Sequence, residues 1–196
     1  MKKLFIALIL TAAFSSGFAQ DFAKRVSEAR TAYSAGNLDD ARFAMQQALQ
    51  ELDMATGKEI LKLLPPKLVD QSANTATDNV SGASGFVGVI VHRDYGTAPD
   101  ASKIEVITNS PLIGTLNALM AVPMLANNAD QKVIRIHGYK ALLTKNSGAE
   151  GEKPNYQIQM PLQSSMIMID APGKTPEQIT KIAEGLPVEQ IAKLIQ

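Results

Sequence analysis

The sequence predicts an α+β fold: an N-terminal α-helical hairpin followed by a mostly antiparallel β-sheet with helices packed on one face. Residues 22–64 carry apolar side chains at helical spacing. Residues 85–170 instead contain short runs in which apolar and polar side chains alternate, separated by turn-forming residues. Two helical runs follow residue 170. Strands in hairpin order, with helices between or after them, are typical of an α+β domain.

The first 19 residues have the pattern of a secretory signal peptide. Two lysines precede an apolar run over residues 4–13, and small residues stand just before Gln20. The run is much shorter than the ~20 residues that a membrane-spanning helix needs, and there is no cysteine to carry a lipid anchor. We therefore expect a signal peptide over residues 1–19, cleavage after Ala19, and a periplasmic or secreted protein without a membrane span.

The composition argues against several function classes. The chain has no cysteine, so disulfides cannot support it. Removing Lys2 and Lys3 from the 19 basic side chains leaves 17 against 19 acidic ones, a net charge of −2. No run of Lys or Arg marks a nucleic-acid surface. Tryptophan is absent and aromatic residues are few, which argues against carbohydrate platforms and aromatic cages. We expect no nucleic-acid partner.

Residues 21–68 are predicted to form a helical unit. The first helix carries Phe22, Val26, Ala29 and Tyr33 at helical spacing. Gly36 and Asn37 end it, because both tolerate the left-handed conformation of a helix C-cap. A second amphipathic run covers residues 38–52, and so short a turn makes the two helices antiparallel. A capping box at residues 56–59 predicts a third, shorter helix that ends at two prolines, 65 and 66.

Part of this unit resembles one tetratricopeptide-type hairpin, over about residues 22–52. Small and apolar residues stand at that family's spacings: Ala29, Ala32, Gly36, Ala41, Met45 and Ala48. Proteins of this family stack several 34-residue repeats to form a concave binding face, and no second copy is present in this sequence. The favoured interpretation is a hairpin that packs on itself, on its third helix or on the next domain. A partner-binding surface is the alternative.

Residues 69–84 are predicted to be a linker. Their sequence, VDQSANTATDNVSGAS, is polar, short-sided and without period. This prediction makes residues 21–68 and residues 85–196 separate folding units.

The second domain is predicted from strand and helix patterns in order. The predicted strands cover residues 85–96, 103–108, 132–136, 140–144, 156–160 and 165–170. Within the first of them, Gly88 indicates a bulge or a close backbone approach. His137 and Gly138 predict a tight turn or bulge, and residues 165–170 are apolar on both faces, which predicts a central strand. Ser110 and Pro111 predict the start of a helix over residues 112–122. A capping box at residues 175–178 starts the next helix, which Gly185 ends, and the last helix covers residues 187–195.

This order of elements resembles small exported domains of the PsbP/Mog1-like kind. The resemblance rests on the first strand hairpin, the helix that begins at NSPL, and the hairpin around the sequence IHGY, over about 110 residues. Members of that fold mostly act as assembly or binding factors, so the resemblance implies a non-catalytic role.

The residues that could support catalysis or bind a metal do not form a known motif. His92 and His137 are the only histidines, and neither belongs to a zinc-binding spacing. No nucleophile elbow, phosphate-binding loop or dinucleotide fingerprint is present. We therefore expect that the protein is not an enzyme and binds no cofactor. An unrecognised enzyme is the less favoured alternative.

Five methionines fall in the second domain of a protein predicted to be exported: Met120, Met124, Met160, Met166 and Met168. Thioethers suit Cu(I), so a methionine-based copper binder is an alternative function. Methionine as a flexible core filler is the favoured interpretation.

The binding candidate is the charge-free segment 111–125. Its apolar residues are Leu112, Ile113, Leu116, Leu119, Met120, Val122, Met124 and Leu125. They form either an exposed patch that contacts an envelope protein or the lid of a cavity for a small apolar ligand. Burial between the sheet and the hairpin explains them equally well. The favoured function is a non-catalytic protein-binding or assembly factor in the bacterial envelope. The alternative is a carrier of a small apolar ligand under the 111–125 helix.

Overall fold

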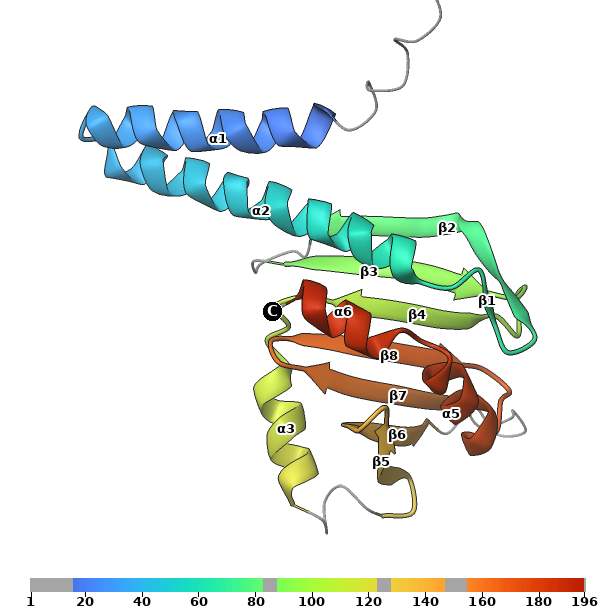
Figure 1. Ribbon diagram of the computed structural model, residues 1–196. Helices are drawn as coiled ribbons and strands as arrows, with labels where there is room; N and C mark the ends of the chain where they lie inside the picture. Colours follow the sequence, from blue (N-terminus) through green and yellow to red (C-terminus); the bar gives the residue numbers. More distant parts are fainter. Residues whose placement is uncertain (1–15, 83–87, 123–127, 147–154, 196) are drawn as a thin grey trace, which may run out of the picture. The chain divides into compact units, whose positions relative to one another are not determined.

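The computed structural model describes residues 16–82, 88–122, 128–146 and 155–195 (Figure 1). Contacts divide the chain into two compact units, residues 1–52 and residues 53–196. The boundary falls inside the long helix α2, Leu38–Leu63.

The first unit is a helical hairpin. Helix α1, Ser16–Ser34, and the first part of α2 are joined by a turn at Gly36, whose φ is 78°. The N–H of Asn37 donates to the carbonyl of Ala32 (2.9 Å), and the Asn37 side-chain oxygen accepts the N–H of Asp40 (3.4 Å) at the start of α2. The turn thus ends the first helix, as the sequence predicts, and Asn37 also caps the second helix.

Helix α2 continues to Leu63, so the prediction of a separate third helix with a capping box at residues 56–59 is wrong. Gly57 lies inside the helix. A Cβ built on it would lie 2.6 Å from Cγ1 of Val80 and 3.0 Å from Cγ2 of Val89. The glycine therefore does not interrupt the helix; its missing side chain lets the end of α2 pack closely against the sheet.

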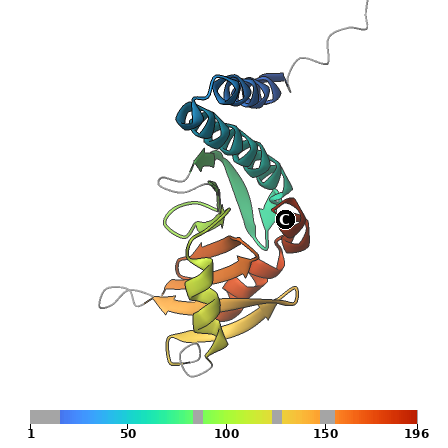
Figure 2. The same ribbon diagram turned by 90° about the vertical axis from the view of Figure 1, so that its left-hand side faces the viewer.

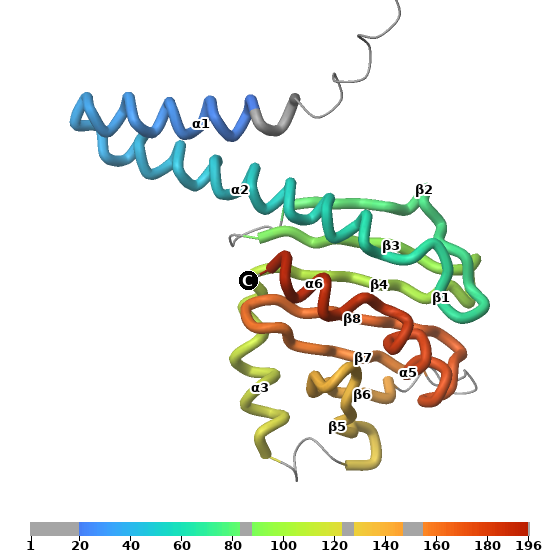
Figure 3. Tube along the Cα trace, in the orientation of Figure 1, coloured from blue at the N-terminus to red at the C-terminus, as the bar shows by residue number. Residues whose placement is uncertain are grey.

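The second unit is built on one eight-stranded sheet in the order β1-β2-β3-β4-β8-β7-β6-β5 (Figure 3). All neighbouring strands are antiparallel. The strands are β1 Lys67–Leu68, β2 Gln71–Gly82, β3 Val89–Tyr95, β4 Ser102–Ile107, β5 Gln131–Ile136, β6 Tyr139–Asn146, β7 Asn155–Leu162 and β8 Ser165–Ala171. The described helices of this unit, besides the end of α2, are α3 Ile113–Ala121, α5 Pro176–Glu184 and α6 Val188–Leu194. The predicted α+β class is confirmed.

The prediction of a linker over residues 69–84 is wrong. Residues 71–82 form strand β2, which pairs with β1 and β3, so neither 68 nor 85 is a boundary between units. Strand β2 lies near one edge of the sheet and most of its side chains are exposed or half-buried. Its pairing with β3 is also irregular between Asn74 and Asn79. An edge strand buries too little apolar surface to produce an alternating hydrophobic pattern.

A polar contact set ties the chain that follows α2 to the sheet. Arg93 of β3 is 8% exposed and donates to both carboxylate oxygens of Asp78 (2.6 and 2.7 Å) and to the carbonyl of Leu64 (2.8 Å). The hydroxyl of Tyr95 donates to the carbonyl of Pro65 (2.8 Å). The hydrogen bonds with Asp78 raise the pKa of Arg93, whereas burial raises that of Tyr95. Asp78 thus gives β2 a specific anchor in the sheet.

The sheet carries a hydrophobic cluster on each face. The larger cluster joins inward residues of β3 to β8 to the end of α2, α5 and α6, and Figure 1 shows α5 and α6 in front of the sheet. Its helical members include Ile60, Ile179, Ile182, Val188 and Ile191, and Leu64 joins them just after the end of α2. Helix α3 packs on the alternate residues of the same strands (Figure 2). The helices of this unit therefore cover two faces, whereas one covered face was expected. Strand β8 is apolar on both sides, and β4 and β6 add Ile107 and Leu142 to the face that α3 covers.

Several local predictions are confirmed. The capping box of α5 forms between Thr175 and Gln178, with proline in the first turn. His137 and Gly138, with φ of 49° and 84°, make the tight turn between β5 and β6. Gly88 has a φ of 141°, and a Cβ there would lie 2.3 Å from the carbonyl oxygen of Thr108, which is the predicted close backbone approach. Strand β8 is central, between β4 and β7.

Candidate functional site

The apolar stripe of α3 faces the sheet. Ile113, Leu116 and Met120 are only 9, 6 and 7% exposed, and they form one cluster with Leu142 and Met166. Leu119 is partly buried against the same cluster. The other predicted site residues lie elsewhere: Leu112 and Val122 are exposed at the two ends of the helix, and Met124 and Leu125 are outside the described residues.

The opposite side of α3 carries small or polar side chains. Gly114, Thr115, Asn117 and Ala118 are exposed there. The predicted helix start at Ser110 and Pro111 is wrong, because α3 begins at Ile113 with Leu112 as its N-cap; the hydroxyl of Ser110 accepts the N–H of Leu112 (3.4 Å). Packing on the sheet therefore accounts for the apolar stripe that the sequence predicted on this helix. The side chains that remain exposed do not form a continuous apolar surface along the described helix.

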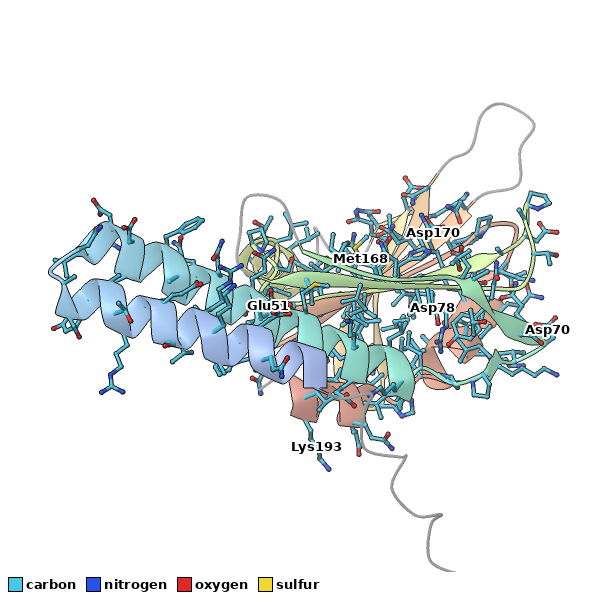
Figure 4. All side chains as sticks on the ribbon, turned by 90° about the horizontal axis from the view of Figure 1, so that it is seen from above. Glu51, Asp70, Asp78, Met168, Asp170 and Lys193 are labelled. Atoms are coloured by element: carbon cyan, nitrogen blue, oxygen red, sulfur yellow. The ribbon has the colours of Figure 1, made fainter. Side chains whose placement is uncertain are left out.

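His92 lies between two carboxylates on the sheet face that α3 shares. Its Nε2 is 3.3 Å from Oδ1 of Asp94, and its Nδ1 is 3.4 Å from Oε1 of Glu105. In the neighbouring strand β8, Met168 pairs with Glu105, and Figure 4 shows Met168 and Asp170 on the opposite side of the sheet from Lys193 of α6. Across the described ranges, no group of three or more histidine, aspartate and glutamate side chains has the arrangement of a metal site. His92 instead contacts one carboxylate of its own strand, β3, and one of the neighbouring strand β4.

His137 is engaged by the backbone. Its Nε2 donates to the carbonyl oxygen of Glu184 (2.8 Å), which ties the β5–β6 turn to the end of α5. The same turn borders a surface groove of about 350 Å³ that is also lined by Tyr139, Glu189 and Lys193. His92 and His137 thus lie on different parts of the second unit, each in contacts that a structural role explains.

The methionines are divided between the two clusters. Met160 is fully buried in the larger cluster, whereas Met120 and Met166 lie in the α3 cluster with Met168 packed against it. Met124 is outside the described residues. Core filling accounts for the four described side chains, since each lies among isoleucine, leucine or valine residues.

The hairpin carries an apolar groove that was not predicted from the sequence. It has a volume of about 490 Å³ and runs between α1 and α2. Its lining residues are Val26, Ala29, Arg30 and Tyr33 of α1 and Leu38, Ala41, Arg42 and Met45 of α2. Four large apolar members of this lining are well exposed: Val26 at 38%, Tyr33 at 70%, Leu38 at 63% and Met45 at 47%. We call this feature the hairpin groove.

The groove exists because alanines fill the interface between the two helices. Ala29, Ala41, Ala44 and Ala48 are buried, and the larger apolar side chains lie beside them rather than between the helices. Phe22, Leu49 and Leu52 continue the same helical stripes and are 39, 45 and 51% exposed. The signal was visible in the sequence, because each helix has an apolar stripe wider than one neighbouring helix can cover.

The protein was compared with known families and structures. Searches against protein-family models, curated proteins and solved structures found no match. The tetratricopeptide-like and PsbP/Mog1-like resemblances therefore stay predictions. In the part of the chain that the structure describes, no helix has both the length and the apolar character needed to cross a membrane.

Proposed function

We propose that this chain is a non-catalytic protein-binding or assembly factor, exported to the bacterial envelope, and that its partner binds the hairpin groove. The observation that supports the proposal is the exposure of large apolar side chains along both walls of that groove. Export is supported by the signal-peptide pattern of residues 1–19. Cleavage after Ala19 would leave residues 20–34 of α1 and would keep every residue that lines the groove.

The energetics favour a binding surface over an unused one. Burial of apolar surface contributes about 25 cal/mol per Å², so exposed side chains such as Tyr33 and Leu38 offer a partner a substantial gain. Helices in stable domains bury their apolar stripes against another element. Within the hairpin itself, no described residue covers the groove, since Tyr33 and Leu38 are more than 60% exposed.

Site-specific crosslinking in cells tests this function. A photoreactive amino acid at Met45, in the groove, should form an adduct with a discrete envelope protein. The matched control position is Phe43, which is 60% exposed on the same helix but does not line the groove. The proposal predicts an adduct from position 45, none from position 43, and loss of the adduct when Leu38 and Tyr33 are both changed to Asp. Absence of any adduct at positions 33, 38 and 45 would contradict it.

A further inference from the structure

The hairpin groove is bordered by two arginines. Arg30 follows Ala29 on α1 and Arg42 follows Ala41 on α2, and both arginines line the groove. The described ion pairs of the hairpin join Glu28 to Lys24 and Arg25. Of the described residues, none forms an ion pair with Arg30 or Arg42. The groove therefore combines apolar walls with positive charge that the hairpin itself does not neutralise.

We infer that the partner segment is an amphipathic α-helix whose apolar stripe is flanked by acidic side chains. This inference rests on the proposed function, because it names the chemistry of the partner that binds the same groove.

The shape of the groove favours a helix. It lies between two antiparallel helices and follows their i, i+3 and i+4 positions, which is where a third helix packs in a bundle. Ala29 and Ala41 lack long side chains, so a third helix can approach closely at that level. From Leu38 to Leu52 the stripe of α2 rises ~21 Å, at about 1.5 Å per residue, which matches about four turns of a docked helix.

The charge of the groove favours acidic flanks. Arginine pairs with carboxylates through two parallel hydrogen bonds, and such charge complementarity selects one partner over another. A second copy of this chain is disfavoured by the same residues, because two hairpins docked by these faces would bring four arginines to one interface. Like charges placed together at an interface oppose association.

Two synthetic peptides test the inference. Each is an 18-residue amphipathic helix with the same leucine stripe and one tryptophan, and the stripe is flanked by glutamate in one peptide and by lysine in the other. The chain contains no tryptophan, so the peptide fluorescence reports binding directly. We expect the wild-type protein to bind the glutamate peptide about tenfold more tightly than the lysine peptide, since two rim ion pairs contribute modestly each. Added salt should reduce the preference.

Charge reversal supplies the matched variants. Arg30→Glu combined with Arg42→Glu should reverse the preference between the peptides. Lys24→Glu reverses a charge on the same helix outside the groove, at a side chain that is 68% exposed, and should leave the preference unchanged. Met45→Asp should weaken binding of both peptides. Circular dichroism of each variant checks that the hairpin remains helical.

Each contrary outcome separates this inference from the proposed function. Equal binding of the two peptides would overturn the acidic flank, and binding of neither would overturn the docked helix. Both results leave the crosslinking test of the proposed function standing. Dimerisation in sedimentation experiments that Met45→Asp abolishes would assign the groove to a second copy. Tighter binding to vesicles of an anionic phospholipid than to the glutamate peptide would assign it to a membrane surface. Either assignment overturns the inference.

Discussion

Helix α3 and the helical hairpin both carry apolar stripes, but the stripe of α3 is buried whereas those of the hairpin are exposed. In α3, Leu116 is 6% exposed because the second face of the sheet is broad enough to cover the whole helix stripe. In the hairpin, Met45 is 47% exposed because two helices with an alanine interface cannot cover each other's stripes. The difference teaches that the area offered by neighbouring elements decides whether an apolar helix is core or surface.

The largest expected effect separates these two environments directly. Leu116→Ala should lower the free energy of unfolding by roughly 2–5 kcal/mol, since it removes a buried side chain and leaves a cavity. Met45→Ala should change it by no more than about 0.5 kcal/mol, because the side chain is on the surface. Chemical denaturation of the two variants measures both. Equal effects would mean that Met45 is as buried as Leu116, and the comparison would fail.

Substitution of one glycine in α2 and one in α3 compares how closely the two helices are packed at those positions. Gly57→Ala should destabilise the protein by about 1–3 kcal/mol, because the new methyl group would overlap Val80 and Val89. Gly114→Ala in α3 has nothing within 4 Å of the added Cβ, so it should stabilise the protein by about 0.5–1 kcal/mol through helix propensity. Thermal unfolding measures whether each substitution raises or lowers the stability of the protein. Stabilisation by both substitutions would show that α2 does not pack closely on the sheet.

Leu112→Ala provides a smaller test within α3 itself. Leu112 is 57% exposed at the start of the helix, so its truncation should change the free energy of unfolding by about 0.5 kcal/mol or less. The measurement is the same denaturant titration as for Leu116→Ala. A loss above about 2 kcal/mol would indicate that this end of α3 is covered, as a core position would be.

The smallest expected effect concerns Asp53, the first residue of the second unit. Burial raises the pKa of its carboxyl, and its Oδ2 finds no hydrogen-bond partner among the described residues. The folded protein therefore holds this proton to a higher pH than the unfolded chain does. Stability falls as pH rises from the ordinary aspartate pKa through the raised one, and stays lower above it.

Asp53→Asn removes the ionisable carboxyl and with it the loss of stability caused by its ionisation. The variant should be more stable than the wild-type protein at neutral pH. The advantage should shrink as the pH falls through the raised pKa of Asp53 and should be lost below the ordinary aspartate pKa. Unfolding experiments at several pH values measure the difference. An advantage that is independent of pH would mean that ionisation of Asp53 is not its cause.

Elements that depend on residues close in sequence could be predicted, whereas an element held by a distant contact could not. The capping box of α5, the tight turn at His137 and Gly138, and the antiparallel pairing of β3 and β4 were predicted because each depends on residues close in sequence. Strand β2 was predicted as a linker because its residues are mostly polar, and it is held by a distant contact between Asp78 and Arg93. Local composition does not report a partner that lies 15 residues away.

The candidate site was likewise only partly predictable from the sequence. The sequence located the apolar stripes of α3 and of the hairpin, since both follow the helical period. It could not show which stripe would be covered, because covering depends on the surface that other elements present. The hairpin groove therefore emerged only when the alanine interface placed Val26, Tyr33, Leu38 and Met45 at the surface.

By itself the sequence determined the α+β class, the helical hairpin and most strands and caps of the second unit, because periodicity, turns and capping act over a few residues. Only the tertiary structure decided that β2 belongs to the sheet, that α2 runs unbroken past Gly57, and that α3 is core while the hairpin is exposed. These outcomes depend on contacts between distant segments, where the burial of one surface requires a second surface to cover it.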